Sequence, residues 1–384
     1  MIDTPTFVAV GTNAALKGLD YPSADEAGQQ LTFANTYHLM LQPGADVIGE
    51  AGGLNKFTGR EGPFITDSGG FQVFSLAYGK NVFEGEGEGE GEGDGDGNGD
   101  GDGDGGELKR RSYNKNAAHM ETRSKQSSMV NVTEDGVIFR SYRDGTSMLL
   151  TPESCVQAQK KLGASIIIPL DELPPYQTDR STLEASLHRS HRWELRSLQE
   201  HLKDRQNQAM YCVVHGGVDL SLRLSSLRYL TSLSPGFDGI AIGGSLGNTK
   251  SEMLSMLGDL MPHVPRDRPA HLLGIADVES IEGCVPLGLD SFDSAYPTRL
   301  ARHGTLLTRG GKLHIKNRAN VRAFGVKVDE ECKCRTCREY DRAYLNHLLR
   351  AKEPVFLHLA TRHNVHFMND YMKKIREKIM NDEI

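Results

Sequence analysis

The chain has 384 residues, 38% hydrophobic and 25% charged, a composition typical of a folded globular protein. No apolar run reaches the roughly 18 residues of a membrane span, and the N-terminus lacks the basic and apolar regions of a secretory signal. The net charge of −7 includes ten acidic residues from 84–106, without which 44 basic face 41 acidic residues, a charge of +3. These features argue against membrane and secreted proteins, favour a cytoplasmic one, and permit a nucleic-acid partner.

Short apolar runs alternate with amphipathic stretches, such as 151–164, 182–202 and 250–264. The apolar runs do not alternate with polar residues, which indicates strands buried on both faces, as in parallel sheets. Eight strand–helix units predict a (β/α)8 TIM-type barrel, with a doubly wound open sheet as the structural alternative. The eight predicted strands are 7–12, 31–37, 63–70, 165–171, 211–217, 239–245, 271–277 and 291–297.

In such a barrel the residues that end the strands converge on one face, where active sites lie. Three of these residues are carboxylates, Asp67, Asp171 and Asp293. We therefore expect the site at this end of the barrel. The predicted strand-end residues are Asn35, Asp67, Asp171, His215, Gly244 and Asp293.

We predict that the barrel covers residues 1–315 and that a zinc-binding subdomain with C-terminal helices covers 316–384. The Glu/Asp–Gly tract cannot bury a core and its charges repel each other, so we expect a disordered insertion over about 80–125. An alternative is an electrostatic mimic of RNA that competes for a basic surface. In that case deletion of residues 84–120 would raise RNA affinity.

Three of the six cysteines, Cys332, Cys334 and Cys337, form a C-x-C-x-x-C motif whose thiolates can wrap one zinc ion tetrahedrally. Three thiolates and one imidazole would close the coordination shell, so we expect one structural Zn²⁺. The alternative is three reduced surface thiols. The candidate fourth ligands are His358, His363 and His366, with His347 less favoured.

Several segments together resemble the tRNA-guanine transglycosylases, also called queuine tRNA-ribosyltransferases. They are NTYHLMLQPGAD, GPFITDSGGFQVFSL, DGTSMLLTPE, FDGIAIGGS, FDSAYPTRLARHG and CKCRTC with its downstream histidine. The resemblance implies a (β/α)8 barrel with a zinc subdomain, and His363 as the fourth zinc ligand. It also implies an enzyme that replaces guanine at the wobble position, 34, of GUN-anticodon tRNAs with a 7-deazaguanine.

The resemblance assigns roles to the residues of the predicted site. Asp293 would be the nucleophile that attacks ribose C1′, and Asp67 the general acid/base that protonates the departing guanine. Asp171 would accept the base N1–H and N2–H donors, Gly244 would offer a backbone N–H, and Phe71 would stack on the purine. The remaining base-binding positions that we expect are Ser68, Gly69, Gly70, His215 and Gly247.

The resemblance also predicts the macromolecular partners. The substrate would be tRNA of the Asp, Asn, His and Tyr types, and the chain would form a homodimer or a heterodimer with a non-catalytic homologue. The alternative for the arginines below is an ordinary solvated surface. The expected RNA-binding residues are Gly274, Ser280, Thr298, Arg299 and Arg302.

Three departures from the family pattern bear on function. His215 stands where the family usually has Gln, so His215→Gln should preserve activity and flatten its dependence on pH near 6–7. Gly247 and Thr249 align with the Val and Glu of members that use the aminomethyl precursor, and a glycine there favours the bulkier queuine. Only six residues precede the first predicted strand, so the barrel bottom is expected to close differently or the start to be misassigned.

Three other functions compete with base exchange. A non-catalytic partner subunit would keep the barrel and zinc but lose the carboxylates, both of which are present here. An archaeal-type relative would carry extra RNA-binding domains. A zinc-containing tRNA-binding module without catalysis would not exchange guanine into tRNA, and exchange should depend on Asp293.

Overall fold

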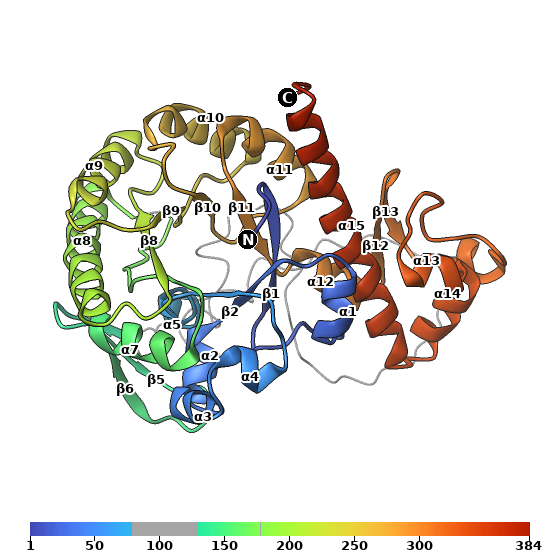
Figure 1. Ribbon diagram of the computed structural model, residues 1–384, viewed down its shortest axis with the longest axis horizontal. Coiled ribbons are helices and arrows are strands. Elements are labelled where there is room, and N and C mark those ends of the chain that lie inside the picture. Colours follow the sequence, from blue (N-terminus) through green and yellow to red (C-terminus); the bar gives the residue numbers. More distant parts are fainter. Residues whose placement is uncertain (79–129, 177) are drawn as a thin grey trace, which may run out of the picture.

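The computed structural model describes residues 1–78, 130–176 and 178–384, so the predicted acidic insertion lies outside the described residues. Eight parallel strands form a closed barrel in the order β1-β11-β10-β9-β8-β7-β3-β2 (Figure 1). This confirms the predicted barrel and excludes the open sheet. The strands are β1 Thr6–Gly11, β2 Leu31–Ala34, β3 Phe64–Thr66, β7 Ile166–Ile167, β8 Ala209–Val214, β9 Gly239–Ile242, β10 Ala270–Leu272 and β11 Ser291–Ser294.

Helices surround the barrel, so its strands are buried on both faces. This explains why most of them are unbroken apolar runs in the sequence. Every residue of β2, β9 and β11 is buried. Side chains fill the interior of such a barrel, and helices cover its outside (Figure 1). The helices of the barrel are α1 Tyr21–Glu26, α2 Thr36–Leu41, α3 Ala45–Glu50, α4 Leu54–Thr58, α5 Gly70–Tyr78, α7 Pro152–Leu162, α8 Arg180–Lys203, α9 Leu220–Ser232, α10 Lys250–Leu260, α11 Val278–Cys284 and α12 Tyr296–Arg302, with 3-10 turns η3 Met261–His263 and η4 Val285–Leu287.

Barrel closure brings the first and last strands together. Val8 of β1 pairs with Asp293 of β11 on one side and with Leu31 of β2 on the other, and β2 in turn pairs with β3. The ends of β3 and β11 are therefore separated by only two strands. This is the arrangement that two distant carboxylates need if they are to serve one site.

A small antiparallel sheet, absent from the sequence prediction, lies against the outside of the barrel. It consists of β4 Val130–Val132, β5 Val137–Arg140 and β6 Ser147–Leu150. The buried Trp193 of α8 donates its indole N–H to the Glu134 carbonyl oxygen at 2.9 Å, which fixes the β4–β5 turn against that helix.

The C-terminal part packs beside the barrel and contains β12 Thr305–Thr308, β13 Gly311–His314, η5 Arg318–Arg322, α13 Arg335–Glu339, α14 Arg342–Arg350 and α15 Val355–Met380. Figure 1 shows α15 running between the barrel and the rest of this part. Phe356 and Leu359 of α15 belong to the core around the cysteine motif, whereas Met368 and Met372 belong to the barrel core. One helix thus joins the two cores.

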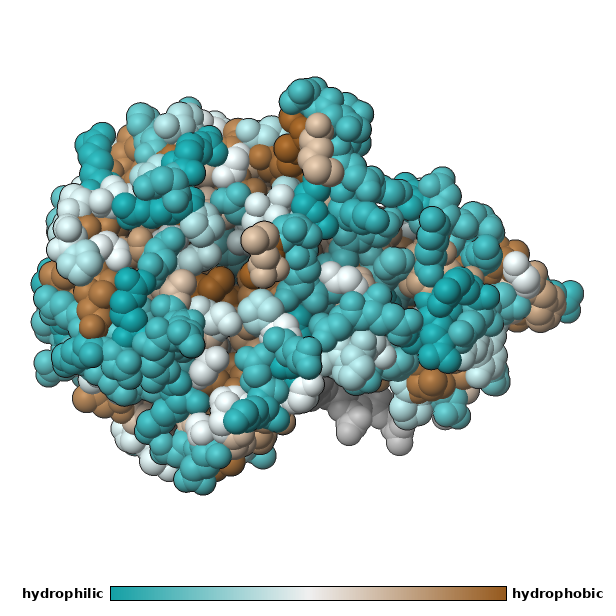
Figure 2. Space-filling view, viewed as in Figure 1, coloured by the Kyte–Doolittle hydropathy of each residue, from teal (hydrophilic) through white to brown (hydrophobic). Residues whose placement is uncertain are grey.

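No helix in the described ranges is long and apolar enough to cross a membrane. On the face drawn in Figure 2, hydrophobic residues occur as separate small groups among hydrophilic ones. That face shows no continuous apolar belt.

Candidate functional site

Asp293 ends up near the C-terminal end of β11, with 5% of its surface exposed. Its Oδ1 atom accepts the Gly274 backbone N–H at 2.9 Å and lies 3.1 Å from His271 Nε2. His271 is fully buried in β10, and its Nδ1 lies 2.8 Å from the Ser291 hydroxyl. Both hydrogen bonds that Asp293 makes within the described chain fall on Oδ1. Oδ2 is therefore the oxygen available for chemistry.

Asp67 follows β3 and is held by the loop after β2. Its Oδ2 accepts from the Asn35 side-chain amide at 2.8 Å, and its Oδ1 accepts from the Thr36 backbone N–H at 2.7 Å. Burial raises the pKa of Asp67 to about 6, and the nearby charge of Asp293 adds to the rise, although the hydrogen bonds from Asn35 and Thr36 oppose it. A carboxyl with this pKa can both give and take a proton near neutral pH.

The raised pKa predicts a stability cost at Asp67. Asp67 ionises at higher pH when folded than when unfolded, so folding stability falls as pH rises from about 4 to about 6 and stays lower above that. A shift of about two units corresponds to at most about 3 kcal/mol. Asp67→Asn removes this titration. The free energy of unfolding of the variant, relative to that of the unsubstituted chain, should therefore be higher at pH 8 than at pH 4.5. Urea unfolding at both pH values measures this, and an equal effect at both would contradict the assignment.

Asp171 follows β7 and lies beside the turn at residues 66–70, which we call the TDSGG turn. Its Oδ1 accepts from the Ser68 hydroxyl at 3.2 Å, and the same hydroxyl accepts from the Gly70 backbone N–H at 3.2 Å. Burial raises the pKa of the Asp171 carboxyl, while the neighbouring His215 lowers it. The predicted residues Ser68, Gly70 and Asp171 are therefore joined by hydrogen bonds, and Ser68 directly follows Asp67 in the chain.

Two glycines in the predicted site are required by the backbone. Gly69 has a φ of +80°, and a Cβ there would lie 3.0 Å from the Tyr37 backbone nitrogen. Gly244, after β9, has a φ of +74°. Phe71, the first residue after the turn glycines, is 49% exposed, so it is not part of the core.

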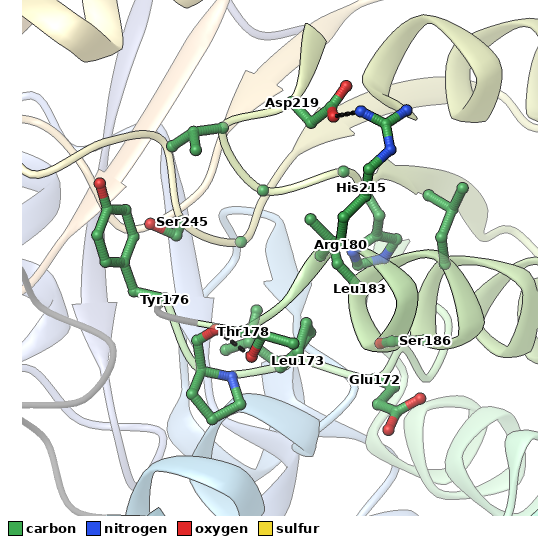
Figure 3. Close-up of a pocket in the computed structure, with 17 residues that line it drawn as sticks. Glu172, Leu173, Tyr176, Thr178, Arg180, Leu183, Ser186, His215, Asp219 and Ser245 are labelled. Carbon is green, nitrogen blue, oxygen red and sulfur yellow. Dashed lines mark hydrogen bonds and ion pairs between the residues drawn. The ribbon is translucent and has the colours of Figure 1, made fainter. Parts of the chain in front are cut away.

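A cavity of about 200 Å³ opens beside Asp171, between the loops after β7, β8 and β9 (Figure 3). Glu172, Tyr176, His215 and Ser245 line it, and an ion pair between Arg180 and Asp219 lies at one side (Figure 3). Burial lowers the pKa of His215, so the imidazole is neutral at pH 7.

Gly247 lies in the loop between β9 and α10 with a φ of +126°. A Cβ at this position would lie 2.8 Å from Glu252 Cβ, and the Asn248 backbone N–H donates to Glu252 Oε2 at 2.8 Å. The loop therefore needs glycine at 247 for its own packing. This local requirement exists alongside any role of Gly247 in admitting a larger ligand.

The residues predicted to bind RNA fall into two groups. Gly274 gives its backbone N–H to Asp293, and the buried Ser280 donates its hydroxyl to Asp277 Oδ2 at 2.6 Å at the start of α11. Thr298 is buried and donates to the Ala295 carbonyl oxygen at 3.0 Å. The side chains of Ser280 and Thr298 thus serve local structure, whereas Arg299 is exposed and Arg302 half-buried on α12.

The cysteine motif meets the predicted histidine on α15. The sulfurs of Cys332, Cys334 and Cys337 lie 3.7, 3.5 and 3.3 Å from His363 Nδ1, and the four ligand atoms lie within 4.8 Å of one another. Tetrahedral zinc with ordinary Zn–S and Zn–N bonds requires separations of about 3.5 Å. His363 Nε2 lies 2.7 Å from the Leu307 carbonyl oxygen, which leaves Nδ1 as the ligand atom. The four residues therefore fit a structural zinc ion.

Two buried residues of the site carry no local signal in the sequence. His271 contacts Asp293, and Glu194 of α8 lies 3.5 Å from His215. A histidine that starts an apolar strand and a glutamate in an amphipathic helix both have ordinary structural explanations. Only the barrel register and the inward face of α8 reveal their contacts.

Comparisons with known proteins agree with this geometry. A family model described as "Queuine tRNA-ribosyltransferase" matches residues 1–88 and 112–384, and the unmatched residues lie within the predicted insertion. The queuine tRNA-ribosyltransferase of Protochlamydia amoebophila is 50% identical over 384 residues, which cover 100% of this chain and 90% of the relative. Proteins of the same name from Chlamydia caviae and Chlamydia trachomatis serovar L2 are 46% and 43% identical, covering 100% of this chain and 93% of each relative. The chain therefore belongs to the queuine tRNA-ribosyltransferase family of pentosyl-transferring enzymes.

Proposed function

We propose that this chain exchanges guanine at position 34 of GUN-anticodon tRNAs for a 7-deazaguanine, queuine, through a covalent link between Asp293 and ribose. The observation that carries the proposal is that two carboxylates at one end of the barrel have different surroundings, each suited to a different role. Asp293 has one oxygen held by His271 and Gly274 and the other available, as a nucleophile requires. Asp67 has a pKa of about 6, as a proton carrier requires.

The two residues give a balanced double displacement. Asp293 Oδ2 forms a bond to ribose C1′ while the bond from C1′ to guanine breaks, and Asp67 gives its proton to the departing base. The incoming base then returns a proton to Asp67 and forms the new bond to C1′, which releases the Asp293 carboxylate. Splitting the exchange in this way replaces one difficult step with two easier ones, and ribose C1′ is bonded to Asp293 between them.

Recognition of the base would use the region around the TDSGG turn. The Asp171 carboxylate can accept both donors of a guanine-type edge, and its Oδ1 is already oriented by Ser68. Gly244 can bring a backbone N–H to the base carbonyl because no side chain intervenes. The exposed ring of Phe71 would stack on the purine after the base leaves the anticodon stack.

The tRNA would approach across the loops after β10 and β11. Arg299 on α12 presents an exposed guanidinium suited to phosphate, with Arg302 one helical turn further on. We propose tRNAs of the Asp, Asn, His and Tyr types as substrates. We also propose that the chain acts as a homodimer or with a non-catalytic homologue, and that one structural Zn²⁺ is held by Cys332, Cys334, Cys337 and His363.

Queuine is proposed over the aminomethyl precursor because Gly247 and Thr249 replace the Val and Glu of precursor-using members, and because the relatives above are named for queuine. The experiment incubates purified protein and tRNA-Tyr with labelled guanine, queuine or precursor. A tRNA with adenine at position 34 serves as the control. We expect label from guanine and queuine only in the tRNA that carries guanine at this position. Preference for the precursor would overturn the choice of base, and absence of all exchange would overturn the function.

A further inference from the structure

Two buried polar atoms beside the base site face each other without a hydrogen-bond partner. Glu194 Oε1 and His215 Nε2 are both unpartnered within the described residues, and they lie 3.5 Å apart. Glu194 is fully buried, and its other oxygen, Oε2, accepts the Val213 backbone N–H at 2.9 Å. His215 is 5% exposed, and its backbone N–H donates to the Ser226 hydroxyl at 3.1 Å. One hydrogen atom between Oε1 and Nε2 would satisfy both.

The charge balance decides which atom carries that hydrogen. Nε2 also lies 3.4 Å from Asp171 Oδ2, so an ionised Glu194 would place two carboxylates around one imidazole nitrogen. Burial raises the pKa of Glu194 well above its ordinary value, and the Val213 N–H opposes this only in part. Asp171 is more open to solvent and is held by Ser68, so it is the better place for the negative charge. Glu194 is then the neutral partner.

We propose that Glu194 is a protonated positioning residue, whose carboxylic acid donates a hydrogen bond to His215 Nε2 and so puts the ring hydrogen on Nδ1. His215 lines the cavity beside Asp171, and Nδ1–H is then the donor that the neutral ring offers to the carbonyl oxygen of a bound base. The hydrogen bond needs Oε1 and Nε2 to approach by several tenths of an ångström, which a small side-chain rotation supplies. This role deepens the proposed base exchange and rests on it.

Other ionisable groups surround the pair, and the test must separate them. Arg223 of α9 donates from its guanidinium to the carbonyl oxygens of Val214, Gly217 and Ser245, and its charge lowers the pKa of His215. Loss of the Glu194 proton at high pH should turn His215 Nε2 into the donor and leave Nδ1 without hydrogen. The titratable or charged groups that face Glu194 or His215 are Asp171, Glu172, His191, Cys212, Arg223 and Tyr229.

The first experiment needs no substrate. ¹⁵N NMR of histidine-labelled protein, with the His215→Gln spectrum used for assignment, distinguishes protonated from unprotonated ring nitrogens. At pH 7 we expect His215 to carry hydrogen on Nδ1, and Glu194→Gln to keep it there because the amide also donates. Glu172→Gln is the matched control: it removes a nearby charge without touching the hydrogen bond, so it should leave the ring hydrogen of His215 on Nδ1. A hydrogen on Nε2 in the unsubstituted protein at pH 7 would overturn the proposal, whether or not the protein exchanges bases.

The second experiment measures KM for guanine from pH 6 to 9.5 in four proteins: unsubstituted, Glu194→Gln, His215→Gln and the double variant. At pH 7, Glu194→Gln should keep KM within about twofold, since the neutral amide imitates the neutral acid. At high pH the unsubstituted protein should lose about tenfold more affinity than Glu194→Gln. When His215→Gln is already present, adding Glu194→Gln should leave KM unchanged. If Glu194→Gln instead raises KM equally with and without His215→Gln, Glu194 acts only on folding.

Discussion

Replacing Asp293 by Asn is expected to lower guanine exchange by on the order of 10⁴-fold or more and to abolish the covalent enzyme–tRNA adduct. The amide keeps the size of the carboxyl and can still accept the Gly274 N–H through its oxygen. It presents an NH₂ group where Asp293 Oδ2 would attack ribose C1′, so the first bond cannot form. Labelled guanine exchange gives the rate, and a denaturing gel with tRNA detects the adduct.

A matched control comes from the same strand region. Asp290 precedes β11 at the opposite end of the barrel, where its Oδ2 accepts the Ala270 backbone N–H at 2.7 Å. Asp290→Asn keeps this acceptor through its amide oxygen, so exchange and adduct formation should stay within a few-fold of the unsubstituted protein. Adduct formation by Asp293→Asn, or an equal loss of exchange in both variants, would remove Asp293 from the role of nucleophile.

Loss of one ligand of the proposed zinc site is expected to have the largest effect on stability. Cys337→Ala removes one of the four candidate ligands, which are three cysteines and His363. Metal binding is coupled to folding at such sites. We expect the purified variant to contain less than about a tenth of an equivalent of zinc, against one equivalent in the unsubstituted protein. The lost binding energy of about 5 kcal/mol or more should lower the unfolding midpoint by at least about 5 °C. Elemental analysis and calorimetry measure these two quantities.

Cys284→Ala provides the comparison for that result. Cys284 is buried in α11, outside the cysteine motif, and its truncation costs only the packing of one sulfur. This variant should keep one equivalent of zinc and lose much less stability. Full zinc content in Cys337→Ala, or the same destabilisation in both variants, would contradict a zinc site at these four residues.

The barrel, and the end of it that carries the candidate site, were predictable because their signals are local and periodic. Unbroken apolar runs identified strands buried on both faces. The polar residues that end these runs, such as Asp67 and Asp171, lie beyond the C-terminal ends of β3 and β7. The parallel pairing of the strands can then be predicted without further information, because eight strand–helix units close into a barrel. The C-x-C-x-x-C spacing predicted the metal cluster for the same reason: three ligands so close in sequence are already neighbours.

Other parts of the site depend on contacts that no local pattern encodes. His271 meets Asp293 only through the β10–β11 register. Glu194 faces His215 only because the inner side of α8 carries an ionisable residue, a type that an amphipathic helix normally keeps in water. Thr298 and Ser280 carry hydroxyls that suit RNA, yet their helix starts bury them. The β4–β6 sheet rests on short strands whose pairing follows from the β4–β5 turn held by Trp193.

Helix α15 also affects the order of events during synthesis. It packs on β1 and α1 at the beginning of the chain, on α12 beside β11, and on α13 of the cysteine motif. A ribosome releases this helix after all eight strands, so the seam between the first and last strands stays uncovered until residues 355–380 emerge. The apolar strand β1 is made first, so it lacks α15 for most of translation, and a chaperone that shields β1 would have its longest opportunity here.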